Sequence, residues 1–441
     1  MDKAPRVLIV GGGYVGMYAA LRMQQKMRTG ELQITVVDPN SYMTYQPFLP
    51  ESGAGNLEPR HVVAPLRRVL HKCEIINGRI EKVDHAGKRA LLQPQEGPAR
   101  ELDYDILVMC PGSIARTLPI PGLAEVGIGF RTVAEAIYLR NQVLNRLDSA
   151  ASSPDPDLRR RALTFVFVGG GYAGIEALAE LEDMARSAIR FYPNLTPRDM
   201  RWVMVEASGR ILPEVSASMG LYTIEQLAHR GIEVKLNTRV TSLEGGHVVL
   251  DNGEQFDAET VVWTAGVRPH PLLESTDLPV DDKKRLKATA FLQVEGVADA
   301  WTAGDCGAVP DLSKSDGSFT GPSAQHAVRQ ARRLADNLLK ALRGQPILPY
   351  EHKYAGSVAS LGLYKGVAEI YGIKLRGFPA WFMHRTYHLS RMPTFNRKVR
   401  VLTDWTIALF FRREIVSLGA FQDPRADFRA AATPLPPADG Q

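Results

Sequence analysis

Two glycine-rich segments in this chain have the residue types and spacing that hold a phosphorylated ligand. The first follows an apolar run at residues 6–10 (RVLIV) and contains Gly11, Gly13 and Gly16. Gly11 permits a tight turn, Gly13 lets the backbone approach a pyrophosphate, and Gly16 lets the next helix pack closely on the strand. A second apolar run ends in Asp38, which is placed to accept hydrogen bonds from ribose hydroxyls. The segment therefore predicts a dinucleotide-binding turn.

The same pattern repeats in the middle of the chain. Residues 163–168 (LTFVFV) lead into Gly169, Gly171 and Gly174, and the next apolar run ends in Glu206. In both copies the amide groups and the positive dipole at the start of a helix suit the phosphates of a dinucleotide. Two copies in one chain are typical of enzymes that hold FAD and a nicotinamide cofactor facing each other.

Glu206 bears on which nicotinamide cofactor the second copy prefers. A carboxylate at the ribose 2′ position repels a 2′-phosphate, so we expect NADH to be preferred over NADPH. Arg210 lies close enough in the sequence to soften that preference.

The elements that must position these residues are strand, turn, helix and strand, in that order in each copy. This order predicts an α/β fold with two Rossmann-like dinucleotide-binding domains, and a length of 441 residues suits two or three domains. Residues 104–112 and 260–266 have the character of strands that return the chain between domains, the second ending at Gly266.

A further strand pattern, residues 299–307 (DAWTAGDCG), contains Gly304 and Asp305 near its end. An acid at this place is able to bind the ribityl chain or the pyrophosphate of a flavin. The alternative is that Asp305 is a helix N-cap or a turn residue.

Composition narrows the class of partner. The formal net charge is +5 and the pI is about 9.0, which mildly favours anionic partners such as nucleotides or an anionic lipid surface. The N-terminus has no pattern of a signal or transit peptide. No apolar run reaches 18 residues, so we expect no transmembrane helix.

The three cysteines, Cys73, Cys110 and Cys306, form no close pair in the sequence. This spacing argues against a disulfide framework and fits a reducing compartment. It also argues against a relay of electrons through thiols. The remaining acceptor is a diffusible one, either a quinone or another small oxidant. Cys306 adjoins Asp305, but we interpret it as a small buried residue.

Residues 372–413 mix basic and aromatic side chains, and Asp404 is the only acid among them. Two short helices are expected, at about 379–391 and 399–411, separated by Pro393, and each is too short to span a bilayer. Such amphipathic helices suit a membrane interface. The alternatives are a dimer contact or packing on the flavin domain, and a nucleic-acid partner is not expected.

Taken together, these segments resemble those of the type II NADH dehydrogenases, flavoproteins with two dinucleotide-binding domains. The resemblance extends over residues 6–421. The segments that carry it are GGGYVG at 11–16, YQPFLPESGAG at 45–55, GGGYAGIEALAEL at 169–181, VVWTAGVRP at 261–269, TAGDCG at 302–307 and GPSAQHAVRQA at 321–331. It implies that FAD binds at the first turn and at residues 302–307, and that NADH binds at the second turn.

The resemblance also implies a domain plan and a location. The expected plan has an FAD-binding domain at 1–118 and 288–350, an NADH-binding domain at 119–287, a C-terminal membrane-associating region at 351–422 and a disordered tail at 423–441. The expected protein is a homodimer that is peripheral to the cytoplasmic face of a bacterial cell membrane. Its partner is a quinone, and no metal is expected.

Glu176 and Gln325 are the two residues to which the resemblance assigns catalysis. It implies that Glu176 faces the junction of flavin, nicotinamide and quinone; the alternative is an acid in the first turn of a helix that stabilises the helix dipole. Ala324 and Gln325 match the AQxxxQ motif that lines the quinone tunnel of the family.

The second glutamine of that motif is replaced here by Arg329, with Gln330 shifted by one residue. One residue turns a side chain by about 100° around a helix, so Gln330 cannot take its place. The identity of the acceptor is therefore open. Val83 completes the expected cofactor-binding set.

The leading hypothesis is an FAD-dependent, non-proton-pumping NADH:quinone oxidoreductase. A soluble NAD(P)H-dependent flavoprotein reductase with another small-molecule or protein acceptor is the first alternative. A slow, redox-sensing flavoprotein is the second.

Overall fold

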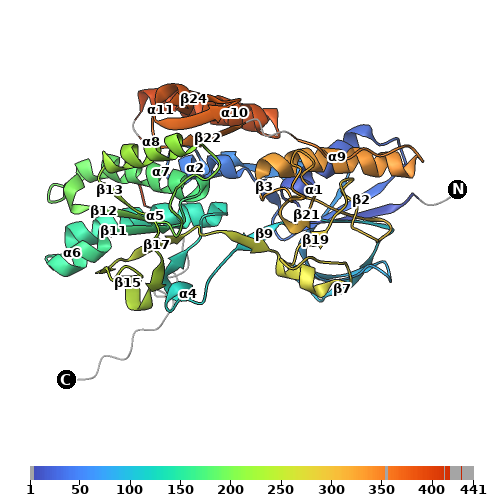
Figure 1. Cartoon of the computed structure of the whole chain (residues 1–441), viewed down its shortest axis with the longest axis horizontal. Coiled ribbons are helices and arrows are strands. Elements are labelled where there is room, and N and C mark those ends of the chain that lie inside the picture. Colours follow the sequence, from blue (N-terminus) through green and yellow to red (C-terminus); the bar gives the residue numbers. More distant parts are fainter. Residues whose placement is uncertain (1–3, 353–355, 412, 418–428, 430–441) are drawn as a thin grey trace, which may run out of the picture.

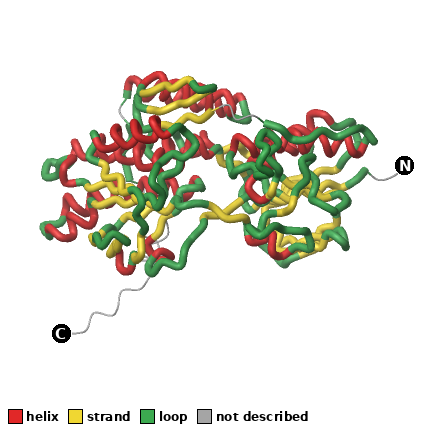
Figure 2. The backbone as a smooth tube through the Cα atoms, in the orientation of Figure 1, coloured by secondary structure: helices red, strands yellow, loops and turns green. Residues whose placement is uncertain are grey.

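The protein is represented by a computed structural model that describes residues 4–352, 356–411, 413–417 and 429. It has two α/β lobes side by side, and the C-terminal segment lies over the helices of the second lobe (Figure 1). Figure 2 shows the strands inside each lobe with the helices around them. This arrangement agrees with the α/β class expected from the sequence.

The first lobe is built on a seven-stranded sheet in the order β20-β8-β1-β2-β5-β6-β7. Pairing is parallel from β20 to β5 and antiparallel from β5 to β7. The strands are β1 (Arg6–Val10), β2 (Gln33–Asp38), β5 (Glu74–Asp84), β6 (Arg89–Pro94), β7 (Arg100–Asp103), β8 (Ile106–Met109) and β20 (Ala300–Thr302). The central strand β1 is almost wholly apolar because both of its faces are covered.

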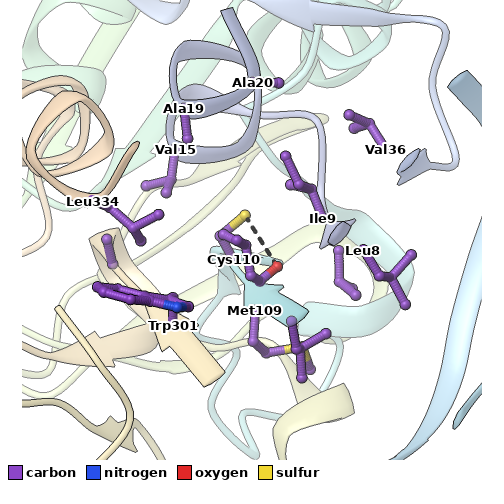
Figure 3. Packing of buried hydrophobic residues seen from close by; sticks show 14 of the residues in the cluster. Leu8, Ile9, Val15, Ala19, Ala20, Val36, Met109, Cys110, Trp301 and Leu334 are labelled. Atoms are coloured by element: carbon purple, nitrogen blue, oxygen red, sulfur yellow. Dashed lines mark hydrogen bonds between the residues drawn. The ribbon is translucent and has the colours of Figure 1, made fainter. Parts of the chain in front are cut away.

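Helices α1 (Tyr14–Lys26) and α9 (Ala324–Leu342) pack against each other on this sheet. Figure 3 shows Val15 of α1, Leu334 of α9 and Trp301 of β20 within one buried apolar cluster. Smaller elements complete the lobe: β3 (Tyr42–Thr44), β4 (Val63–Pro65), α3 (Leu66–Val69), η6 (Pro271–Ser275), β19 (Leu286–Lys287), η7 (Gly304–Cys306) and β21 (Gly307–Ala308). Between β3 and β4 the chain reaches over to the second lobe through η1 (Gln46–Phe48), α2 (Leu49–Gly53) and η2 (Pro59–Val62), which pack in the core of that lobe.

The second lobe interrupts the first in the sequence. Its parallel sheet has the order β10-β17-β11-β12-β13, and a small antiparallel sheet, β14-β15-β16, lies beside it. The strands are β10 (Gly127–Ile128), β11 (Thr164–Val168), β12 (Arg201–Val205), β13 (Ile232–Lys235), β14 (Val240–Ser242), β15 (His247–Leu250), β16 (Gln255–Asp257) and β17 (Thr260–Trp263). The helices are α4 (Leu123–Val126), α5 (Val133–Ser152), α6 (Pro156–Ala162), α7 (Tyr172–Ala188), η3 (Ile189–Phe191), η4 (Pro197–Asp199), α8 (Ala217–Ala228) and η5 (Glu244–Gly246).

The two segments that cross between the lobes pair with each other as β9 (Ser113–Ala115) and β18 (Val267–Pro269). After the second crossing, Leu272 and Leu286 pack in the core of the first lobe. The domain limits at 118/119 and 287/288 stay a prediction.

The C-terminal segment forms an antiparallel sheet, β22 (Gly356–Ser360), β23 (Gly366–Ile370) and β24 (Ile373–Arg376), followed by α10 (Phe378–Arg391) and α11 (Phe395–Phe410). Helix α11 begins four residues before the expected start because Thr394 caps it, its hydroxyl accepting from the Arg397 amide at 3.4 Å. Within the described ranges, every helix is too short or too polar to cross a membrane. The tail expected at 423–441 lies outside the described residues apart from Arg429.

Candidate active site at two glycine turns

The first glycine turn joins β1 to α1. Gly11 has φ +101°, and a Cβ on Gly16 would lie 1.8 Å from the Gly11 carbonyl oxygen, so both positions need glycine. A Cβ on Gly13 would meet nothing within 4 Å, which leaves this point of the backbone open to a phosphate. The Gly12 amide donates to Asp38 Oδ2 at 2.7 Å. The turn therefore has the shape and the open approach that a pyrophosphate requires.

Asp38 braces this turn from the end of β2. Its second oxygen accepts from the Asn40 amide at 2.7 Å. Burial raises the pKa of the Asp38 carboxyl, against the lowering effect of these hydrogen bonds. The carboxyl thus lies beside the turn, where the sequence predicts a ribose.

The second glycine turn, between β11 and α7, repeats this geometry. Gly169 has φ +112°, and a Cβ on Gly174 would lie 2.0 Å from the Gly169 carbonyl oxygen. A Cβ on Gly171 would meet nothing within 4 Å, as at Gly13 in the first glycine turn. The Gly170 amide donates to Glu206 Oε2 at 2.6 Å, as Gly12 does to its aspartate. The repetition was expected from the sequence.

The Arg210 side chain is not available to pair with a ligand beside Glu206. The Arg210 guanidinium donates to the carbonyl oxygens of Leu212 and Val215 in its own loop. Glu206 accepts from the Ser208 amide at 2.7 Å through its other oxygen. The acid is therefore held at the turn, and the arginine is already engaged by the backbone.

Asp305 lies in η7 of the first lobe and reaches the crossing strand β9. Ser113 Oγ donates to Asp305 Oδ2 at 2.6 Å, and Arg131 Nη2 donates to Ser113 Oγ at 3.0 Å. The Asp305 side chain does not cap η7. It is thus bonded across to the junction of the lobes, which a simple N-cap would not be.

Gln330, the glutamine shifted by one residue, has a structural contact of its own. Its side-chain oxygen accepts from the Gly304 amide at 2.7 Å, and its nitrogen donates to Thr320 Oγ1 at 3.0 Å. Gln330 is fully buried. It therefore fixes the segment that carries Asp305, and the sequence reasoning missed this role.

The two residues expected to be catalytic contact opposite ends of the same strand, β22. Gln325 Nε2 donates to the carbonyl of Gly356, the first residue of β22, at 3.4 Å. Glu176 Oε1 accepts from the amide of Ser360, the last residue of β22, at 2.9 Å. Because Gln325 lies on α9 and Glu176 on α7, this strand joins the two lobes at the candidate site.

Glu176 is buried and lies in the second turn of α7, since the helix begins at Tyr172. The first turn, residues 172–175, contains no acid. The alternative of a first-turn acid that stabilises the helix dipole is therefore wrong. Beside the Ser360 amide, the carboxylate has His384 Nε2 of α10 at 3.1 Å.

The surroundings of Gln325 are basic. The side-chain oxygen of Gln325 lies 3.0 Å from His352 Nε2. Arg329 Nη1 donates to the main-chain carbonyl of Gln325 at 2.9 Å. Arg329 and His352, with Arg333, Leu348, Pro349, Glu351 and Tyr371, line an open depression of about 650 Å³. Ala324 begins α9 directly after its N-cap, Ser323.

Two further predicted residues lie away from this centre. Val83 is buried in the first lobe near the end of β5, where it pairs with Ala90 and forms a bridge with Thr276. Gly266 lies at the start of the second crossing, directly before β18, with open space at its Cβ position. Their assignment to cofactor binding stays a prediction.

All three cysteines lie in the described part of the chain and are free thiols. Burial raises the pKa of Cys306 to about 11 and that of Cys73 to about 12, and it raises the pKa of Cys110 as well. Figure 3 shows Cys110 among apolar side chains. A raised pKa disfavours the thiolate, which is the nucleophilic form, at all three positions.

Residues 5–331 match the family of pyridine nucleotide-disulphide oxidoreductases. A type II NADH:quinone oxidoreductase of Staphylococcus saprophyticus is 29% identical over 86% of this chain and 93% of its own length. A demethylphylloquinone reductase of Synechocystis sp. is 31% identical over 92% of this chain and 96% of its own. A solved structure of NDH2 from Plasmodium falciparum in complex with NADH has the same fold, with a TM-score of 0.87 at 17% identity, covering 93% of this chain and 99% of that one.

These matches confirm the fold class and the resemblance on which the prediction of an FAD- and NADH-dependent enzyme rested. Both glycine turns fit a dinucleotide, because each leaves an open backbone approach beside a helix start and a braced carboxylate. The chain thus belongs to the pyridine nucleotide-disulphide oxidoreductase family and, within it, to the type II NADH:quinone oxidoreductases.

Proposed function

We propose that this protein oxidises NADH held at the second glycine turn and reduces a quinone beside strand β22, with FAD held at the first turn. The observation that carries the proposal is that Gln325 and Glu176, from different lobes, meet the two ends of β22. When bound, FAD takes a hydride from NADH and passes two electrons to the acceptor.

The residues divide between the two dinucleotides as follows. The set for FAD is Gly11, Gly13, Gly16, Asp38, Val83, Gly304, Asp305, Ala324 and Gln325. The set for NADH is Gly169, Gly171, Gly174, Glu206 and Gly266. Their support is the pair of braced turns and the bond from Ser113 that holds Asp305 at the junction of the lobes.

We further propose that the protein docks on the cytoplasmic face of a bacterial membrane through α10 and α11. Phe395, Leu409 and Phe410 of α11 are 81%, 69% and 79% exposed. Exposed apolar surface of this kind marks an interaction site. Basic residues of the same helix, Arg397, Lys398 and Arg400, suit anionic lipid headgroups.

A homodimer is also proposed. β24 lies at an edge of its sheet and carries Ile373, which is 65% exposed, and edge strands of this kind favour pairing with a second copy. Sedimentation velocity of the detergent-purified protein measures this directly, and a monomer at micromolar concentration contradicts it.

The test of the main proposal is anaerobic stopped-flow of the flavin-loaded protein, mixed first with NADH and then with a short-chain quinone. We expect NADH to bleach the flavin absorbance rapidly and the quinone to restore it. Bleaching by NADH without recovery by any quinone contradicts quinone reduction.

Arg329 favours a second candidate, a reductase for a water-soluble acceptor. It stands where the family motif has a glutamine, and it lines the open depression of about 650 Å³ together with Arg333. A basic depression suits a small anionic acceptor. Recovery of the bleached flavin with such acceptors alone supports this candidate.

A further inference from the structure

A row of buried ionisable side chains begins at Glu176 and continues along α10. Glu176 Oε1 lies 3.1 Å from His384 Nε2, and His384 is 1% exposed. The ring of His384 meets the ring of His388, one helical turn further on, with centroids 4.6 Å apart. Three groups that can carry a proton therefore follow one another from α7 onto α10.

The row continues to Tyr45, which follows β3 in the sequence and packs in the core of the second lobe. His388 Nδ1 lies 3.4 Å from the hydroxyl of Tyr45, which also donates to the His388 carbonyl at 3.0 Å. The Tyr45 ring lies 6.3 Å from that of Tyr14, the residue directly after Gly13 in the first glycine turn. The row thus connects the helix of the second dinucleotide fold with the turn of the first.

Polar atoms without partners gather around this row. Within the part of the chain that the structure describes, Glu51 Oε1, Ser52 Oγ, Trp381 Nε1 and both ring nitrogens of His384 are buried and lack a hydrogen-bond partner, so the contact of His384 with Glu176 is one of charge and distance. Glu51 and Ser52 lie on α2, and Trp381 and His384 on α10. Buried polar groups of native proteins bond to internal water when no protein group serves them. These unpartnered atoms of α2 and α10 are thus groups that can exchange a proton or a hydrogen bond beside the row.

The charges that face His384 come from three helices. Glu176 and Glu180 of α7 and Glu51 of α2 are acidic, and Arg385 of α10 is bonded to Glu51 at 2.8 Å. Burial lowers the pKa of His384, but the Glu176 carboxylate and the other two acids outweigh it, so that pKa is raised.

His388 has the opposite tendency. Burial, followed by the charge of His384, lowers its pKa well below the ordinary value. The carboxylates thus favour the protonated form of His384, and burial favours the neutral form of His388, which has a nitrogen able to accept a proton. A donor that favours the proton, next to an acceptor that favours the neutral form, is the pairing that proton transfer uses, either directly or through one water.

We propose that His384 and His388 carry a proton to Glu176, and through it to the quinone, during turnover. The inference rests on the proposed function, for which the overall reaction is NADH + H⁺ + quinone → NAD⁺ + quinol. The hydride of NADH supplies both electrons and one hydrogen nucleus, and water supplies the second proton. The histidines pass this second proton to Glu176 beside the quinone and are reprotonated from water, so they end each turnover unchanged.

The first test compares His384→Gln and His388→Gln with the wild-type holoenzyme. His85→Gln is the matched control, because His85 is another buried histidine beside a tyrosine, Tyr104, in the first lobe. Each protein is assayed with a short-chain quinone, which takes up protons, and with ferricyanide, which takes up electrons alone. We expect quinone turnover to fall about 100-fold in the two variants only, with ferricyanide turnover and the KM for NADH unchanged. A parallel fall with ferricyanide overturns the relay.

The second test separates proton transfer from packing. In His384→Ala we expect added imidazole to restore quinone turnover, because it replaces the missing ring. A variant that keeps its flavin and gains nothing from imidazole contradicts the relay and makes His384 a packing residue.

Histidine NMR of the wild-type holoprotein needs no change at His384. We expect one histidine to have a pKa above the ordinary value of about 6.5, and we expect this rise in pKa to disappear in Glu176→Gln. If Glu176→Gln moves no histidine, the pair is not coupled and the relay is overturned. Failure of the proposed function has a different signature: the wild-type holoenzyme then reduces ferricyanide but no quinone, whereas normal quinone turnover in His384→Gln overturns the relay alone.

Discussion

Glu206 combines two duties in one side chain, since it braces the second glycine turn and stands where a 2′-phosphate would lie. Because Arg210 is bonded to the carbonyls of its own loop, it does not offset the repulsion between this carboxylate and such a phosphate. In Glu206→Gln we expect the ratio of kcat/KM for NADH to that for NADPH to fall about 10-fold, or roughly 1.4 kcal/mol. Steady-state kinetics with both cofactors measure it. Glu244→Ser, an exposed acid of the same lobe, is the control, and an unchanged ratio contradicts the assignment.

A change at Glu176 tests the candidate site, because this residue lies away from the first glycine turn, where FAD is proposed to bind. In Glu176→Ala the Ser360 amide and His384 both lose their carboxylate partner. We expect bound FAD to remain and quinone turnover to fall about 10- to 100-fold. Flavin absorbance per protein and quinone-dependent NADH oxidation report the two effects, and unchanged turnover removes Glu176 from the site.

Glu180 makes stability depend on pH. Burial raises its pKa to about 7, although Arg413 opposes this. An acid whose pKa is higher in the folded state stabilises the fold below its unfolded pKa, and this contribution is lost as pH rises through about 7. We therefore expect wild type to lose stability relative to Glu180→Gln between pH 5 and 8, by an amount on the order of a few kcal/mol. Melting temperatures measured across this range check it, and parallel curves for the two proteins contradict it.

At the scale of the element, α11 differs from α10 in how it is held. Helix α10 buries several side chains, including Trp381 and His384. Among the described residues of α11, only Val401 is buried. Removing the chain from Phe378 onward would thus disturb the core as well as a surface. Point changes on α11 separate these effects.

The double variant Leu409→Asp with Phe410→Asp should keep its fold and lose membrane binding. Burying one such side chain contributes about 1.5–3 kcal/mol, so we expect affinity for anionic vesicles to fall at least about 10-fold. Vesicle flotation measures it. Leu221→Asp on α8, also an exposed leucine, is the matched control. Equal flotation of the double variant and wild type defeats the membrane proposal.

Elements with local signals could be predicted from the sequence. Glycine spacing and the flanking apolar runs indicate both dinucleotide folds, because the turn, the helix start and the strand are contiguous. The sheet β22–β24 escaped prediction, because β22 (GSVAS) is short and made mostly of small residues whose pairing depends on β23.

At the scale of the whole molecule, the candidate site depends on contacts that no local pattern reveals. Gln330 was noted only as a displaced motif residue, yet it holds Gly304. His384 and His388 are four residues apart, a spacing that places both on one face of a helix and could have been noticed in the sequence. Their partners Glu176 and Tyr45, however, lie far away in the sequence. The two lobes must be assembled before these groups meet.

The position of β20 has a consequence for biosynthesis. The first sheet receives this strand only after the whole second lobe has been translated, so its neighbour β8 waits at an open edge. At about 5–20 residues per second, a ribosome needs roughly 10–40 s to move from Met109 to Ala300. During that interval the nascent first lobe is a template for wrong strand pairing. The cell must therefore shield an unfinished flavin fold until the second lobe has emerged.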